Sequence, residues 1–101
     1  MHESNRPEPP RHLSADAKRR WKSLLAEYPL DDTAALTLLQ AALEAFDQMN
    51  DARKLLKREG FITTDRFGKP KQHPATFVMR DARQQLLAAF KALRLDPISN
   101  T

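Results

Sequence analysis

The chain of 101 residues contains no cysteine, so it can form neither a disulfide nor a thiolate metal site. Its only two glycines, Gly60 and Gly68, stand eight positions apart and precede no Gly-Lys-Ser or Gly-Lys-Thr sequence, which excludes a glycine-rich phosphate loop. No apolar run approaches the ~18 residues of a membrane-spanning helix. These absences argue against a nucleotide-hydrolysing enzyme and against a membrane protein.

Residue patterns for catalysis and metal binding are also sparse. His2 and His12 fall in the N-terminal tail, and His73 stands at a helix boundary without a Cys, His or carboxylate at ligand spacing. Asp47 and Asp51 lie one helical turn apart, but Lys54 and other basic residues follow on the same solvent-facing side, as is typical of a solvated helix. We therefore expect no catalytic residue, no metal site and no cofactor.

The overall charge favours a polyanionic partner. Seventeen Lys and Arg residues against thirteen Asp and Glu residues give a net charge of +4, and the isoelectric point is about 9.8. Residues 1–28 contain six basic and four acidic side chains, residues 29–59 contain four and six, and residues 60–101 contain seven and three. The positive excess therefore lies outside the middle of the chain.

Size and composition predict one small helical domain. Hydrophobic residues make up 41% of the chain and charged residues 30%, as in ordinary globular proteins. Residues 1–12 contain three prolines among polar side chains and predict a mobile arm, residues 13–97 form the domain, and residues 98–101 are a tail. The first residues show no apolar core of a signal peptide, so we expect a reducing, cytoplasmic setting, which is the host cytoplasm if the protein is viral.

The pattern from Thr33 to Glu59 predicts one long helix, with Asp31 or Asp32 as its N-cap and Gly60 just beyond its end. Its apolar residues fill an arc of about 200° on a helical wheel, whereas a surface helix usually shows a stripe only a little over ~100° wide. We therefore expect the helix to be covered from two sides, by its own chain and by another subunit. The predicted subunit contacts are Leu38, Ala42, Ala45 and Met49.

A shorter amphipathic helix is predicted before it, from the N-cap Ser14 to Pro29, with Trp21 anchoring the apolar side. The opposite side gathers basic residues. These residues are either phosphate contacts or an ordinary solvated face, and basic side chains of the arm just upstream favour the first interpretation. The candidate DNA-binding residues in this part of the chain are Arg11, Lys18, Arg19 and Lys22.

After Gly60 the segments FITT, DRFG and KPKQ predict a small β-hairpin or ordered loop, with Gly68 supplying a positive φ. The sequence His73-Pro74 then predicts the start of a third helix, which runs to about Leu95 and packs along the long helix. The expected fold is therefore mainly α, with three helices and a small hairpin between the second and third. Three outward-facing cations of the hairpin are further DNA-binding candidates: Arg66, Lys69 and Lys71.

In this order of elements, from about Leu13 to Pro97, the chain resembles the phage terminase small subunits. One branch of that family shares two spaced glycines, a His-Pro pair and a helix that ends in a Leu-Gly-Leu-x-Pro-like stretch. Arg94 stands where the family usually has the last glycine. The residues that carry the resemblance are Gly60, Gly68, His73, Pro74, Leu93, Leu95 and Pro97.

The resemblance implies a non-catalytic DNA-packaging factor. Such a protein forms a ring-like homo-oligomer, binds viral double-stranded DNA and presents it to the large terminase subunit, which holds the ATPase and nuclease. A different class of function is also open: a helical adaptor or antitoxin-like module that binds a protein partner through the long helix and binds no DNA. Steep salt dependence of DNA binding separates the first from the second.

Overall fold

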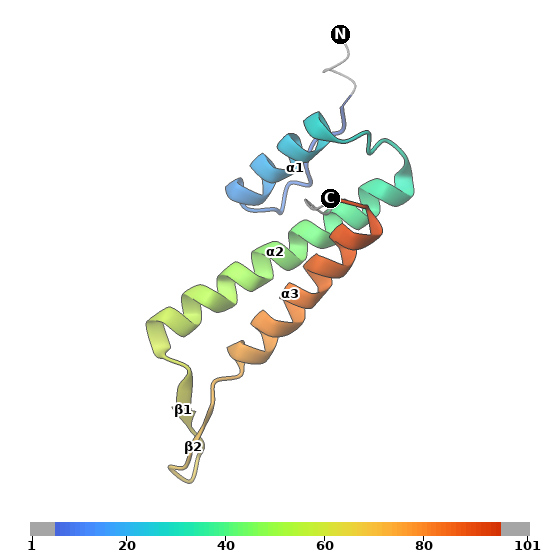
Figure 1. The fold of residues 1–101 in the computed structure, drawn as a ribbon. Coiled ribbons are helices and arrows are strands. Elements are labelled where there is room, and N and C mark those ends of the chain that lie inside the picture. The colour runs from blue at the N-terminus through green and yellow to red at the C-terminus, as the bar shows by residue number, and fades with distance from the viewer. Residues whose placement is uncertain (1–5, 96–101) are drawn as a thin grey trace.

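The computed structural model describes residues 6–95 and confirms a mainly helical fold with a small hairpin between the second and third helices (Figure 1). The predicted tail, residues 98–101, and Pro97 lie outside the described residues, as do residues 1–5 of the predicted arm. The elements are α1 (Ala15–Glu27), α2 (Thr33–Glu59), β1 (Ile62–Thr64), β2 (Pro70–Gln72) and α3 (Ala75–Ala92).

Both predicted ends of α2 are confirmed. The Asp32 side chain accepts a hydrogen bond from the Ala35 N–H at 2.7 Å, which satisfies one of the free amides at the helix start. At the other end Gly60 has φ +88°, a conformation that strains any residue with a Cβ, and its N–H donates to the Leu56 carbonyl at 2.7 Å.

Helix α1 packs across the first half of α2. Its N-cap is Ser14, whose hydroxyl accepts from the Ala17 N–H at 3.0 Å. The buried residues at this end form one cluster, in which Leu39 and Leu43 of α2 are fully covered. The cluster consists of Leu13, Ala17, Trp21, Leu39 and Leu43.

Helix α3 returns from the hairpin along the remaining length of α2 (Figure 1). Alanines occupy much of the contact, with Ala82 buried beside Ala45 and Ala75 buried beside Ala52, so the two backbones approach closely. Together α1 and α3 cover most of the wide apolar arc of α2. Elements of the same chain therefore cover α2 from both of the sides that the apolar arc predicted.

The end of α3 differs from the prediction. The helix ends at Ala92 rather than Leu95, because Arg94 adopts φ +61° and reverses the chain. The Leu95 N–H then donates to the Phe90 carbonyl and the Arg94 N–H to the Lys91 carbonyl, which is the Schellman pattern of helix termination. Leu95 is buried at 6% exposure after this turn.

The hairpin extends beyond the helices at one end of an elongated molecule measuring 61 × 33 × 20 Å (Figure 1). Strands β1 and β2 pair antiparallel, with Thr63 opposite Lys71. Pro70 cannot donate to the ladder, and it occupies the first position of β2. No residue of either strand is buried, so the hairpin has no core of its own.

Candidate nucleic-acid interface

The structure does not bring the predicted DNA-binding residues together. Lys18, Arg19 and Lys22 lie on α1, which packs on the first half of α2, and Arg11 lies just before it. The other cations belong to the hairpin, which follows the C-terminal end of α2. Leu43, in the α1 cluster, lies seventeen positions before Gly60, which caps α2. This separation corresponds to about 25 Å of helix. The candidates therefore form two groups at opposite ends of the molecule.

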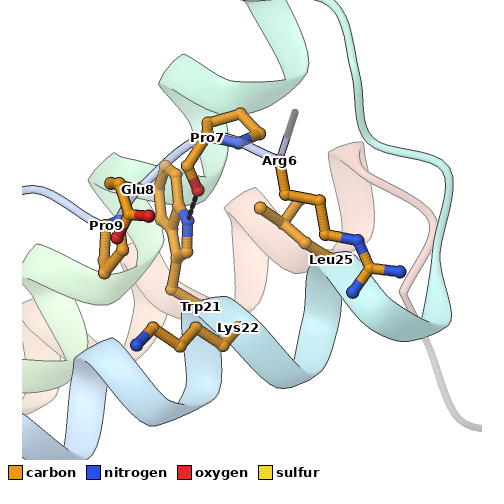
Figure 2. Close-up of a pocket in the computed structure, with 7 residues that line it drawn as sticks. All are labelled: Arg6, Pro7, Glu8, Pro9, Trp21, Lys22 and Leu25. Atoms are coloured by element: carbon orange, nitrogen blue, oxygen red, sulfur yellow. Dashed lines mark hydrogen bonds between the residues drawn. The ribbon is translucent and has the colours of Figure 1, made fainter. Parts of the chain in front are cut away.

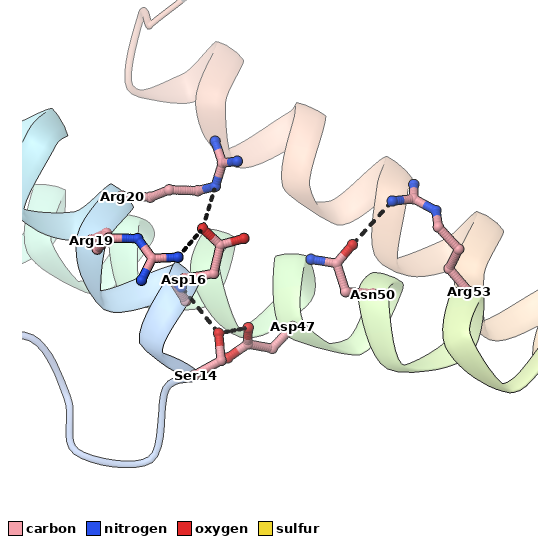
Figure 3. Close-up of polar contacts among 8 residues, drawn as sticks. Ser14, Asp16, Arg19, Arg20, Asp47, Asn50 and Arg53 are labelled. Atoms are coloured by element: carbon pink, nitrogen blue, oxygen red, sulfur yellow. Dashed lines mark hydrogen bonds and ion pairs between the residues drawn. The ribbon is translucent and has the colours of Figure 1, made fainter.

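Arg19 of the α1 group and its neighbour Arg20 both pair with a carboxylate (Figure 3). The Arg19 guanidinium lies 3.2 Å from Asp16, and Arg20 lies 3.7 Å from the same carboxylate. Arg20 also places its guanidinium 4.6 Å from the centre of the Phe46 ring on α2. These contacts engage two of the basic side chains within the chain, and they reduce the positive potential around Lys18 and Lys22.

Asp47, which the sequence pattern assigns to a solvated face, has a tertiary role. Its carboxylate accepts hydrogen bonds from both the Ser14 backbone N–H, at 2.8 Å, and the Ser14 hydroxyl (Figure 3). Asp47 therefore fixes the start of α1 to the middle of α2. It also lines a surface groove of mixed charge, in which Asp16 and Asp51 lie with the basic residues Arg19, Arg53 and Lys54.

The N-terminal segment lies against the other side of α1. The Trp21 indole N–H donates to the Pro7 carbonyl at 3.0 Å, and Trp21 is only 3% exposed (Figure 2). Arg6 and Lys22 line the same pocket beside Trp21. Residues 6–12, predicted to form a mobile arm, thus run along the helices in the structure, and their mobility stays a prediction.

The hairpin group is fully exposed. Arg66, Lys69 and Lys71 are all at the surface, and the turn that carries the first two is held by Asp65. The Asp65 Oδ1 accepts from the Phe67 N–H at 2.8 Å and from the Lys69 N–H at 2.9 Å. This turn fixes the backbone on which Arg66 and Lys69 stand.

A further set of arginines, which the sequence analysis missed, continues the positive charge onto the helices. Arg53 of α2 and Arg80 and Arg83 of α3 line one groove whose apolar part comes from Met49, Met79 and Leu87. The only sequence signal is Arg80 and Arg83 at i,i+3 on one helix face. Their alignment with Arg53 depends on how α3 packs on α2, which no local pattern specifies.

The charge is divided unevenly along the molecule. Residues 53–83, at the hairpin end, contain nine Lys or Arg and three Asp or Glu residues, a net charge of +6. The rest of the described chain, residues 6–52 and 84–95, contains eight basic and eight acidic residues, a net charge of zero. A phosphate backbone would therefore be attracted to the hairpin end of the molecule.

Two carboxylates have pKa values shifted by neighbouring side chains. The hydrogen bond from His73 lowers the pKa of Glu59, at a His73 Nε2 to Glu59 Oε1 distance of 2.9 Å. Hydrogen bonds from Gln40 and then His12 lower the pKa of Glu44. Both shifts keep the carboxylates ionised, as expected of structural groups rather than of a general acid.

The four residues predicted to contact another subunit lie mostly inside the monomer. Ala42 and Ala45 are buried at 0% and 2% exposure, and Met49 is covered where α3 packs on α2. Leu38 alone remains half-buried. The larger apolar surface lies elsewhere in the described part of the chain, on the exposed side chains Phe61, Ile62, Phe67, Phe77, Val78 and Leu87.

Neither a metal cluster nor a membrane span is found in residues 6–95. No group of three or more His, Asp or Glu side chains there could hold a metal ion. Within the same range, none of the helices combines the length and apolar character needed to cross a bilayer.

Comparison with known proteins identifies a family. A family model described as phage terminase, small subunit, matches residues 17–101, which is most of the chain. No curated protein and no solved structure matches the chain. The matched segment includes α1 from its third residue onward, together with α2, the hairpin and α3.

Proposed function

The chain belongs to the phage terminase small-subunit family, which gives it a role in DNA packaging, and we propose that it acts there as a non-catalytic double-stranded DNA-binding factor. In this role it assembles into a ring-like homo-oligomer and presents viral DNA to the large terminase subunit. The observation that carries the DNA-binding part is the net charge of +6 on residues 53–83, concentrated at the end where the hairpin projects.

The hairpin group is the main DNA contact in this proposal, and the α1 group is the second. Arg66, Lys69 and Lys71 stand on an exposed element whose neighbours are also basic, whereas Arg19 of the α1 group is already paired with Asp16. Each neutralised phosphate adds about 0.9 to the slope of log affinity against log salt. In a ring every subunit repeats these contacts, so the slope should be steep.

The test compares two matched triple variants of the full chain. The hairpin variant carries Arg66→Glu, Lys69→Glu and Lys71→Glu. The α1 variant carries Lys18→Glu, Arg19→Glu and Lys22→Glu. Both change the net charge by the same amount, but at opposite ends of the molecule. Fluorescence anisotropy with a labelled duplex, measured over a salt series, should show steeply salt-dependent binding by the parent protein. The hairpin variant should lose most of its affinity and slope, and the α1 variant should lose less. Circular dichroism should show unchanged helix content in both.

Parent protein that does not bind the duplex, or binds it independently of salt, would contradict the DNA-binding proposal. That result would favour a helical protein-interaction module, for which the exposed Phe77, Val78 and Leu87 of α3 offer an apolar surface. An α1 variant that binds more weakly than the hairpin variant would place the main contact on Lys18, Arg19 and Lys22 instead.

Assembly is tested separately by light scattering. We propose an oligomer larger than a dimer, because α3 leaves large apolar side chains without cover in the monomer. Leu38 and Leu87 are the positions where a single aspartate should lower the mass of the oligomer without opening the monomer's core. A monomeric parent protein at micromolar concentration would refute the ring.

A further inference from the structure

Phe67 stands at the tip of the hairpin with 74% of its surface exposed, the highest value among the large hydrophobic residues that the structure describes. The hairpin has no buried residue in its strands, so Phe67 contributes to no core of the monomer. An exposed aromatic ring on a projecting element is accessible to a partner, and its burial in such a contact would be favourable.

The turn holds this ring in a defined position. The Asp65 N–H donates to the Lys69 carbonyl at 2.8 Å and the Gly68 N–H donates to the Asp65 carbonyl at 3.0 Å. The Asp65 side chain closes the same turn by accepting from the Phe67 and Lys69 amides. Gly68 has φ +80° with open space where a Cβ would stand, so glycine is required there for its backbone conformation alone.

Basic residues flank Phe67 in the chain, and one of them contacts its ring. The Arg66 guanidinium lies 4.9 Å from the Phe67 ring centre, and Lys69 and Lys71 are exposed on the arm that follows. β-ribbon proteins place their strands in the major or the minor groove of DNA, and proteins that bind the minor groove insert apolar side chains between base steps. An apolar tip flanked by cations matches a base step flanked by phosphates.

We infer that Phe67 is an apolar wedge that enters a groove of double-stranded DNA and inserts against a base step, while Arg66, Lys69 and Lys71 bind the phosphates on either side. This inference rests on the proposed DNA-binding function and adds how the DNA is engaged. A second copy of the chain is the competing occupant of this tip, but an apolar subunit contact would not require the cations that flank Phe67.

Wedge insertion has a consequence for the DNA that binding by charge alone lacks. Unstacking a base step is easiest at flexible TA steps and hardest in stiff A-tracts. The parent protein should therefore bend DNA, and it should prefer a TA-step duplex over an A-tract duplex of the same base composition.

The experiment uses the full chain with Phe67→Ala and, as the matched control, Ile62→Ala, which removes another exposed apolar side chain from the hairpin away from its tip. Phe67→Trp is a variant that retains an aromatic wedge. Two labelled 30-base-pair duplexes of equal composition, one rich in TA steps and one with A-tracts, report affinity by anisotropy and bending by energy transfer between their ends. Phe67→Ala should lose about tenfold in affinity for the TA-step duplex, together with the bend and the preference. Ile62→Ala should retain the bend and the preference.

The Phe67→Trp variant should retain both, and the added indole should be quenched when the duplex binds, since the other tryptophan, Trp21, is buried. If the parent binds DNA and Phe67→Ala binds and bends it equally, the wedge is refuted while the DNA-binding proposal stands. If Phe67→Ala lowers the oligomer mass in light scattering, Phe67 is a subunit contact and the wedge is likewise refuted. Parent protein that binds neither duplex refutes the underlying DNA-binding proposal.

Discussion

His73 joins the end of α2 to the start of α3 by hydrogen bonding to Glu59. Its Nε2 lies 2.9 Å from Glu59 Oε1, while its Nδ1 accepts from the Ala75 N–H at 3.0 Å. Because Nδ1 accepts, the ring proton is on Nε2 and is donated to the carboxylate. The His73 backbone N–H also donates to the Phe61 carbonyl at 2.7 Å, so one residue fixes both sides of the hairpin base.

Replacing His73 with Ala should therefore loosen the hairpin as well as destabilise the fold. The Ala75 N–H lies in a buried contact and would lose its acceptor, which predicts a loss of about 1–3 kcal/mol in the free energy of unfolding. Urea unfolding measures this loss, and DNA anisotropy should show weaker binding because the hairpin is less firmly placed.

His12→Ala is the matched control for this change. His12 also bonds to a glutamate, Glu44, but its side chain is 57% exposed, compared with 11% for His73. Exposed ion pairs contribute only about 0–1 kcal/mol, so the control should cost less. Equal losses from both variants would show that His73 acts as an ordinary surface residue.

The Glu59 pKa gives a prediction for pH. The hydrogen bond from His73 lowers this pKa in the folded state, so the folded protein holds the carboxylate ionised more readily than the unfolded chain. The resulting stability is present above the ordinary value of 4.5 and is lost as pH falls through the lowered folded value.

Glu59→Gln should therefore flatten the decline in unfolding free energy measured by urea denaturation from about pH 5 to pH 3. Some decline should remain, because the pKa of Glu44 is lowered too. In a His73→Ala background the same Glu59→Gln change should have little effect on the slope. A decline unchanged by Glu59→Gln in the parent would exclude this linkage.

Much of the fold could be predicted from the sequence because its signals are local. Asp32, Gly60 and Gly68 mark helix and turn boundaries through their own backbone preferences, and the structure confirms all three. The apolar period correctly located the buried side of α2. The end of α3 was misplaced because Leu93 and Leu95 continue the apolar pattern beyond the point where Arg94 turns the chain.

The candidate site was harder to predict from the sequence, because it depends on tertiary packing. Arg53 meets Arg80 and Arg83 only because α3 folds back along α2. Val78 is an apolar residue of α3, yet it is 49% exposed, because the buried line of this helix follows the alanines Ala75, Ala82 and Ala89. A helical wheel identifies an apolar side but does not show which part of it a neighbouring helix will cover.

Arg94 occupies a backbone conformation that favours glycine. Its φ of +61° costs a residue with a Cβ about 1–2 kcal/mol. Glycine avoids this cost, but it loses more conformational freedom on folding, which offsets part of the gain. Arg94→Gly should therefore raise the unfolding free energy by up to about 1 kcal/mol. Ala88→Gly, at an exposed position inside α3, should lower the unfolding free energy by about 1 kcal/mol. Thermal unfolding of the two variants should give Tm shifts of opposite sign, and shifts of equal sign would contradict this account of the helix end.

Trp21 links the N-terminal segment to α1, so its hydrogen bond can be separated from its packing. Trp21→Phe retains an aromatic ring but loses the N–H that donates to Pro7, which should cost about 1 kcal/mol in urea unfolding. Trp21→Ala should cost about 3–5 kcal/mol because the ring is buried.

Amide exchange provides the second measurement for Trp21. The Leu13 N–H donates to the Pro10 carbonyl at 3.3 Å within the segment that Trp21 holds, so its exchange should accelerate in Trp21→Phe. The Lys18 amide, inside α1, serves as the internal reference. Unchanged exchange at Leu13 would show that the Trp21 to Pro7 bond does not restrain residues 6–12.

Substitutions of Asp65 can separate the electrostatic contribution of the hairpin tip from its structural contribution, because the two should change DNA affinity in opposite directions. Its carboxylate is a negative charge among the cations that we propose bind DNA, so removing the charge alone should strengthen binding. Its Oδ1 also holds the Phe67 and Lys69 amides, so removing the oxygen should disorder the turn and weaken binding.

Asp65→Asn removes the charge but keeps an oxygen that can accept both hydrogen bonds, and it should bind duplex DNA more tightly than the parent. Asp65→Ala removes charge and acceptor together, and it should bind more weakly than Asp65→Asn by about the tenfold that positioning of the Phe67 wedge contributes. Anisotropy at matched salt measures both, with circular dichroism as the check on helix content. If the two variants bound equally well, the tip would act through charge alone, and the ordered turn would have no part in DNA binding.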